Sequence, residues 1–260
     1  YIIDGVLLYS DFKKQFYGVG NKTHFDDEED YTNKAYGFGT GFNRKIFEII
    51  KFGVQYNFQD LHIRDKKSGG LLENYETDGV ISGFGFKTSF DTRDNNIYPQ
   101  KGCKLDVLWM LYNNRFGSSF NYSETAVDFR NYFEIKKDVL FSYQFYSRFL
   151  NGNPPVQTLS TFGGANNMRG FYSGRYVDSV VIFLQPEIKI KLNNMFQLAL
   201  FSGVGNIYRD FESVDLKQIK IASGAGLRIQ LNKNPKINMR TDLAFSSEST
   251  GFYFTILEAF

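Results

Sequence analysis

The chain has 260 residues and a formal net charge of +2, from 30 basic and 28 acidic residues, with one cysteine and two histidines. The near-neutral charge gives no field that would recruit nucleic acid, and the cysteine and histidine counts disfavour an internal disulfide or a zinc site. Aromatic residues make up 18% of the sequence, which is typical of strands with one apolar face. We expect one β domain over residues 1–260, without a metal or cofactor.

No run of about 18 uncharged apolar residues occurs, so the sequence contains no candidate for a membrane-spanning helix. A membrane-spanning strand needs only about 9–11 residues and hides its apolar half by alternation. The start of the chain, Tyr1 to Asp4, lacks the basic and long apolar segments of a signal peptide. We therefore expect the numbered chain to be a mature or truncated form.

Alternation of apolar and polar residues recurs along most of the chain and predicts twelve strands. The expected strands are 1–9, 33–42, 46–59, 79–91, 102–112, 119–134, 138–149, 179–191, 195–205, 217–232, 236–246 and 251–260. Long connections at 10–32, 60–78, 150–178 and 206–216 alternate with short ones at 43–45, 135–137, 192–194 and 233–235. Bacterial barrels show this pattern, with the short turns facing the periplasm. An even strand count places both chain ends on that side.

The charged residues within these strands share the face opposite the large apolar residues. They are Arg130, Arg148, Glu187, Lys189, Arg228, Arg240 and Asp242. An Arg or Lys on the lipid face costs about 2–4 kcal/mol at mid-bilayer, and a spanning sheet has to close because hydrocarbon offers no partner to its backbone. We therefore predict an all-β, transmembrane antiparallel β-barrel with its polar face inside. The alternative is a soluble sandwich or lipocalin-like barrel with its apolar face inside.

A glycine-rich segment lies in the longest predicted connection. It contains Gly163 and Gly164, a short spacer, and then Met168, Arg169, Gly170 and Phe171. Such a segment can be an ordinary surface loop. Its order resembles the Val-Arg-Gly-Phe/Tyr motif of the bacterial surface antigen superfamily, the outer-membrane assembly factors that include BamA and TamA.

A second motif lies upstream, in the connection at 92–101. Asp91, Thr92, Arg93, Asp94 and Asn95, followed by Pro99 and Gly102, resemble that family's Asp-Thr-Arg-Asp-Asn turn. A generic Asp/Asn turn has the same composition. The two motifs occur in the family's order, and the resemblance spans roughly residues 80–260.

The resemblance implies that the glycine-rich loop folds into the barrel lumen and that Arg169 pairs with the inner wall. A guanidinium removed from water needs a carboxylate partner. Glu187 lies on the inward face of the next strand, so we expect an Arg169–Glu187 pair; a solvated Arg169 on a mobile loop is the alternative. Relatives often add an aromatic residue and an Asp, which correspond here to Phe201 and Gly203. Asp242 is the candidate substitute for the absent Asp.

The last predicted strand alternates Phe252, Phe254, Ile256 and Phe260, which resembles the carboxy-terminal signal of outer-membrane proteins. Glu258 falls on the same face and is expected near the headgroups at the periplasmic rim. The family barrel has sixteen strands, and the twelve predicted here match the last twelve. Either four strands and periplasmic POTRA modules precede residue 1, or a shortened barrel closes between its first and last strands.

The resemblance implies a protein of the bacterial outer membrane that is not an enzyme and assists insertion or translocation of proteins. Its implied partners are the lipid bilayer, lipopolysaccharide, client outer-membrane proteins and periplasmic or lipoprotein components. A passive pore, or an anchor for a preceding domain, is the alternative. Catalysis is disfavoured because no carboxylate, serine or histidine shows the spacing of an acid–base or nucleophilic site. The acidic run 26–30 is expected to be a solvated loop tip, with Ca²⁺ binding as the alternative.

Overall fold

The computed structural model describes residues 1–233, 236–256 and 258–260. Its strands are β1 (Ile2–Phe16), β2 (Glu29–Phe47), β3 (Ile50–Arg64), β4 (Gly79–Asp91), β5 (Gly102–Tyr112), β6 (Tyr122–Lys136), β7 (Val139–Gly152), β8 (Ser160–Phe162), β9 (Tyr176–Asp178), β10 (Val180–Lys191), β11 (Phe196–Tyr208), β12 (Lys220–Lys233), β13 (Lys236–Ser246) and β14 (Thr250–Ile256). The 3-10 helices are η1 (Phe25–Asp27), η2 (Leu71–Asn74), η3 (Asn114–Phe116), η4 (Val156–Thr158) and η5 (Leu216–Gln218). Within the described ranges, no helix has the length and apolar character needed to cross a membrane.

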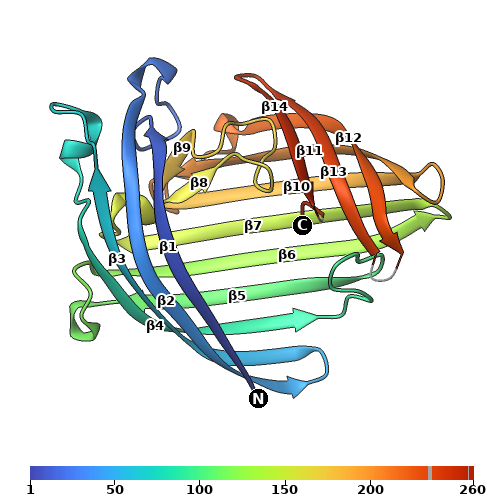
Figure 1. Cartoon of the computed structure of the whole chain (residues 1–260), viewed down its shortest axis with the longest axis horizontal. Coiled ribbons are helices and arrows are strands. Elements are labelled where there is room, and N and C mark those ends of the chain that lie inside the picture. The colour runs from blue at the N-terminus through green and yellow to red at the C-terminus, as the bar shows by residue number, and fades with distance from the viewer. Residues whose placement is uncertain (234–235, 257) are drawn as a thin grey trace.

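Twelve of the strands form one antiparallel sheet in the order β1 to β7 followed by β10 to β14. The hairpin of β8 and β9 is inserted between β7 and β10, which pair directly. The sheet curves strongly, with β1 and β14 as its two edges (Figure 1). No ladder joins these two strands among the described residues. The turns after β2, β6 and β10 define the short-turn end of the barrel, and the opposite end is called the long-loop end.

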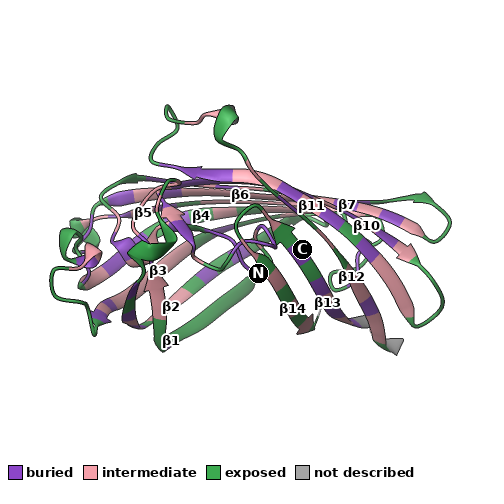
Figure 2. Cartoon of the chain, turned by 90° about the horizontal axis from the view of Figure 1, so that it is seen from above, coloured by how far each residue is buried: buried purple, intermediate pink, exposed green. Residues whose placement is uncertain are grey.

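The alternation places apolar side chains outside and charged side chains inside. On β14, Phe252, Phe254 and Ile256 are 60–71% exposed, whereas Arg228 and Arg240 on β12 and β13 are fully buried. Figure 2 shows that β1 and β14 are mostly exposed. Exposed aromatic residues are stable on an outer wall that faces lipid, and the soluble alternative would require the opposite arrangement. The predicted transmembrane antiparallel β-barrel is confirmed.

Two predicted connections near the start of the chain are wrong. The strand expected at 1–9 continues to Phe16, and β2 already begins at Glu29, so the connection expected at 10–32 is much shorter. The turn expected at 43–45 lies at 48–49. Lys13 near the end of β1 and Lys45 near the end of β2 are charged, and charged residues at such positions favour a loop by composition. Here they extend the strands beyond the apolar belt, where water solvates charge at little cost.

Two further expectations concern the carboxy-terminal part of the chain. The short turn expected at 233–235 lies mostly outside the described residues. The strand expected at 251–260 ends at Ile256, and Glu258 does not lie at the lipid headgroups. Its carboxylate is 2.9 Å from Nζ of Lys189, and both side chains are buried. The inward turn is favourable because a buried ammonium needs a counter-charge.

Candidate functional site

The motif loop, residues 163–175, is the tip of the β8–β9 hairpin. Three backbone pairs from Ser160–Asp178 to Phe162–Tyr176 hold its base. Gly163 has a φ of +102°, and a Cβ at this position would lie 2.2 Å from the carbonyl oxygen of Tyr172. Only glycine tolerates both the left-handed backbone and this close approach. The glycines of the motif therefore fix the shape of the loop.

Arg169 carries the motif into the lumen, where its side chain is 1% exposed. Its Nη2 lies 2.8 Å from a carboxylate oxygen of Glu187, and its Nη1 donates to Asp242 over 2.7 Å. The guanidinium carbon is 3.5 Å from the centre of the Phe201 ring. The loop, β10, β11 and β13 thus bring together the four residues that the sequence nominated. Two carboxylates and an aromatic face offset the desolvation of the buried guanidinium.

Two more arginines complete this cluster. Nη2 of Arg228 is 3.0 Å from Glu187 and its Nη1 donates to Asp242, while its Nε is 3.6 Å from Glu258. Arg240 lies opposite Arg228 in the β12–β13 register, and its Nε is 3.4 Å from Asp242. The sequence placed both arginines on the inward face but not in one cluster with Arg169. The pairing of β12 with β13 places Arg228 directly opposite Arg240, and this register could have predicted that the two arginines lie together.

Arg240 also contacts the loop directly. Its Nη2 donates to the carbonyl oxygen of Ala165 over 3.0 Å, and its Nε donates to Thr255 on β14 over 2.9 Å. One side chain therefore joins the motif loop to the last strand of the sheet.

Gly203 stands at the position where the family resemblance implied an Asp, and another residue fills the space beside it. A Cβ at Gly203 would lie 2.8 Å from Sδ of Met168. The Met168 backbone N–H donates to the Gln185 side chain on β10 over 2.9 Å, which holds Met168 against the barrel wall. The thioether therefore fills the space of a side chain at position 203, and Asp242 supplies the second carboxylate.

The Gly170 backbone attaches the loop to the carboxy-terminal strands. Its N–H donates to the Tyr253 hydroxyl over 2.9 Å, and its carbonyl oxygen accepts from Ser246 and Ser249 over 2.9 and 2.7 Å. A Cβ at Gly170 would lie 3.1 Å from Cβ of Ala222. Glycine is required here because the loop backbone lies directly on the barrel wall.

Phe171 anchors the next position of the motif. The side chain is 1% exposed and packs edge-on against Phe162 and Tyr176, with ring centres 5.2 and 6.5 Å away. Burial of an aromatic ring of this size contributes about 2–3 kcal/mol. The motif therefore combines a charged anchor with an apolar one.

The upstream motif forms the turn between β4 and β5. Side chains of its polar residues accept backbone N–H groups: Asp91 from Arg93, Asp94 from Gln100 and Lys101, Asn95 from Ile97 and Tyr98, and Thr92 from Cys103. Gly102 has a φ of +94°, and Pro99 borders a lumen cavity. This network shapes the turn and does not contact the Arg169 cluster, so we assign the motif a structural role.

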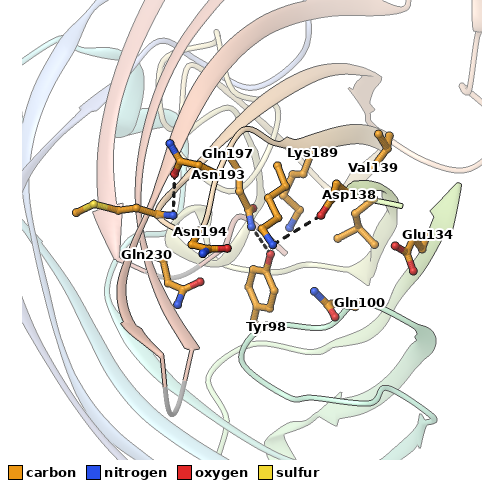
Figure 3. A pocket seen from close by; sticks show the side chains of 13 residues that line it. Tyr98, Gln100, Glu134, Asp138, Val139, Lys189, Asn193, Asn194, Gln197 and Gln230 are labelled. Atoms are coloured by element: carbon orange, nitrogen blue, oxygen red, sulfur yellow. Dashed lines mark hydrogen bonds and ion pairs between the residues drawn. The ribbon is translucent and has the colours of Figure 1, made fainter. Parts of the chain in front are cut away.

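The same turn reaches the short-turn mouth of the lumen. Tyr98 is 7% exposed, and its hydroxyl accepts from Nε2 of Gln197 on β11 over 2.5 Å. Lys189 lies 5.8 Å from its ring centre. Figure 3 shows Tyr98 directed toward Lys189 and Gln197. These three residues line a cavity of about 490 Å³. Tyr98 narrows this mouth, a role that the sequence gave no reason to assign.

A family model for the Omp85 superfamily domain matches residues 5–260. The chain belongs to the Omp85 superfamily. Among solved structures, the Omp85 domain resembles BamA from Haemophilus ducreyi lacking POTRA domains 1–3, with a TM-score of 0.72 and 13% identity over 98% of this chain. It also resembles CdiB from Acinetobacter baumannii, with a TM-score of 0.57 and 13% identity over 88% of this chain.

At this identity the two likenesses show the fold of the Omp85 domain alone. The chain spans 57% of the BamA structure and 42% of the CdiB structure. A comparison with curated proteins gave no match to the sequence.

The acidic run 26–30 of the Omp85 domain is only partly a solvated tip. Glu29 is 3% exposed, and its carboxylate accepts the N–H groups of Lys67 and Leu72 over 3.3 and 3.1 Å. The expectation was wrong here because Glu29 begins β2 and faces inward. In the part of the chain that the structure describes, no group of three His, Cys, Asp or Glu side chains has the arrangement of a metal site.

Proposed function

We propose that this Omp85 barrel resides in the bacterial outer membrane and assists the insertion or translocation of other proteins, without bond-making chemistry. One observation carries the proposal: Arg169 and Gly170 anchor the motif loop inside the barrel against β13 and β14, the last two strands of the sheet. The proposed partners are lipid, lipopolysaccharide, client outer-membrane proteins and periplasmic or lipoprotein components.

The outer edge of β14, at one end of the strand order, supplies the physical basis for insertion. Backbone N–H and C=O groups at a sheet edge pair readily with another extended chain, and hydrocarbon makes such pairing more favourable. On β14 the row of apolar side chains faces outward, so a strand added there would continue the lipid-facing wall. We therefore favour insertion along β14 over transport through the lumen.

The arrangement of the lumen supports the same choice. Residues of the motif loop contact β10, β11 and β13 from inside, and Tyr98 narrows the short-turn mouth.

A passive pore, or an anchor for a preceding domain, is the second candidate. The feature that favours a pore is a set of cavities with mixed polar and apolar linings, of about 490, 530 and 550 Å³.

The decisive experiment is client folding in proteoliposomes that contain the full chain. We expect the chain to accelerate membrane insertion of an unfolded outer-membrane protein, measured as the heat-modifiable band on gels. Arg169→Ala should lose most of this acceleration. The matched control is Arg130→Ala, because Arg130 faces inward and directs its hydrogen bonds and ion pair to Asp128 on its own strand. Insertion that is equally fast with empty liposomes would refute the proposal.

A further inference from the structure

The inner wall of β3 carries three amide side chains in a row, called here the amide row: Gln55, Asn57 and Gln59. Glycines stand directly opposite the amide row in both neighbouring strands, at Gly41, Gly39 and Gly37 on β2 and at Gly85 and Gly83 on β4. A Cβ at Gly41 would lie 2.5 Å from Oε1 and 2.9 Å from Nε2 of Gln55. The glycine at this position therefore leaves the room that the amide occupies on the wall.

Hydrogen bonds along the wall orient the amide row. Nε2 of Gln59 donates to Oδ1 of Asn57 over 3.3 Å, and Nδ2 of Asn57 donates to the Tyr112 hydroxyl over 3.1 Å. Nε2 of Gln55 donates to Oδ1 of Asn43 over 3.1 Å. Among the described residues, no hydrogen bond is made to Oε1 of Gln55 or of Gln59. The amide row therefore offers two free carbonyl acceptors and further N–H groups, because each amide nitrogen carries two.

The amide row lines a cavity of about 530 Å³ inside the barrel, a size that is usual for small-molecule sites. Beside the amides, β4 and β5 contribute the apolar side chains of Ile81, Leu108 and Met110 to its lining. Leu159, which follows η4, adds a fourth apolar side chain. The cavity thus combines free amide groups with an apolar surface next to them.

The charged side chains that line this cavity are Asp4, Glu124 and Arg148, and each has a partner in the barrel. Nε of Arg148 donates to Glu124 over 2.8 Å, and its Nη1 donates to the carbonyl oxygen of Thr158 over 2.7 Å. The Asp4 carboxylate accepts from Nδ2 of Asn43 over 2.6 Å. An anion would meet two carboxylates and a guanidinium that is already paired. The groups free to bind a ligand are therefore neutral, unlike those of the Arg169 cluster.

We propose that the amide row and the apolar side chains beside it bind a neutral saccharide. A sugar hydroxyl both donates and accepts hydrogen bonds, as a primary amide does, so hydroxyl groups can donate to Oε1 of Gln55 and Gln59 and accept from the remaining N–H groups. The apolar C–H face of the sugar ring packs on the apolar side chains. Glycines in a strand interior let a ligand approach the backbone closely. The saccharide site adds to the proposed insertion activity and does not depend on it.

The test measures binding of maltotriose to the full chain in lipid nanodiscs by saturation-transfer difference NMR. Gln59→Met keeps the length of the side chain and removes its hydrogen-bonding groups. Gly39→Val adds methyl groups to the cavity lining, and a Cβ there has its nearest neighbour, the Tyr56 carbonyl oxygen, at 3.8 Å, so the barrel should fold unchanged. Gln230→Met is the matched control, because Gln230 lies on β12 and lines the separate cavity at the short-turn mouth.

We expect saturable binding of maltotriose by the parent chain. Gln59→Met should weaken this binding about fivefold, the loss expected for one neutral hydrogen bond. Gly39→Val should remove the binding, and Gln230→Met should leave it unchanged. Spermidine and trialanine serve as comparison probes for a cation and for a peptide backbone. The inference would be overturned by a folded parent chain that does not bind maltotriose, by equal affinities of the parent chain and Gly39→Val, or by tighter binding of either comparison probe.

Discussion

Arg169 and Asp242 are 73 positions apart in the sequence, yet their side chains meet at 2.7 Å in the interior of the barrel. The contact fastens a loop tip to a strand near the edge of the sheet. Asp242 also accepts from Arg228, so a single carboxylate holds one cation of the loop and one of the wall. The position of the loop therefore depends on the charges of Glu187 on β10, Arg228 on β12 and Asp242 on β13.

Replacing Arg169 should destabilise the barrel strongly. Arg169→Ala leaves Glu187 and Asp242 short of one buried counter-charge, and breaking a buried ion pair costs about 3–5 kcal/mol. Arg169→Lys should recover only part of this, because an ammonium cannot bridge both carboxylates as a planar guanidinium does. Urea unfolding in lipid vesicles measures the difference. Arg130→Ala, at a partly exposed pair, should cost about 1 kcal/mol or less; equal losses for the two alanine variants would contradict the role of the cluster.

The packing of Gly203 against Met168 predicts a compensating pair of substitutions. Gly203→Asp alone should destabilise the chain, because a Cβ there meets the Met168 sulfur at 2.8 Å. Met168→Gly in the same chain frees that space, suits the left-handed backbone at position 168, where φ is +55°, and should restore part of the loss. A double-mutant cycle of unfolding free energies is expected to show a coupling of about 1–3 kcal/mol. Strictly additive effects would mean that the two positions do not share this space.

The contact at Glu248 should depend on pH. Burial raises the pKa of Glu248, which lies in the turn between β13 and β14, but hydrogen bonds from Tyr176 and Lys220 and the charges of Lys220 and Arg175 outweigh it. The pKa of Glu248 therefore lies below the usual value. A carboxyl group whose pKa is lowered in the folded state stabilises the folded contact fully at pH values above the ordinary pKa of a glutamate, about 4.3. This stabilisation is lost as the pH falls through the lowered value. The distribution of distances between spin labels at Lys22 and Ser247, measured by electron–electron double resonance, should therefore broaden as the pH falls below the ordinary range of a glutamate.

Glu248→Gln provides the control for this titration. The amide does not ionise in this range, so the distance distribution should be broader at neutral pH and change little on acidification. A variant that titrates like the parent chain would show that another group causes the effect.

The filled lumen predicts a small ionic current. In planar bilayers the parent chain should conduct weakly, and deletion of residues 155–177 should raise the single-channel conductance several-fold, because the loop crosses the lumen and is tied to its wall. Arg169→Ala should give frequent transitions between the two levels. A large, steady current in the parent chain would instead favour the passive pore.

The sequence predicted the sheet well because alternation is a local signal. On β12 and β13, the inward Arg228, Arg240 and Asp242 alternate with outward residues that are mostly apolar, Leu227, Ile229, Met239 and Leu243, so the face of each strand could be assigned from the chain alone. Strand ends were harder. Residues such as Lys13 and Lys45 favour a loop by composition, whereas the strands continue through them because water lies beyond the apolar belt.

The site was only partly accessible from the sequence. The motif resemblance and the need for a counter-charge suggested Glu187 for Arg169, and the structure has the two groups 2.8 Å apart. Arg175 and Tyr98 carried no such signal, because their partners lie on loops and strands far along the chain. Glu258 was placed on the wrong side because periodicity was extended past Ile256, where the strand has already ended.

The inward position of Glu258 has an electrostatic consequence for the whole interior. Among the described residues, the cations Arg169, Arg228, Arg240 and Lys189 face the carboxylates Glu187, Asp242 and Glu258. Glu258 alone of the three follows the last strand instead of lying within one. If these final residues swing outward, the interior gains uncompensated positive charge, and a small mobile anion becomes the natural replacement.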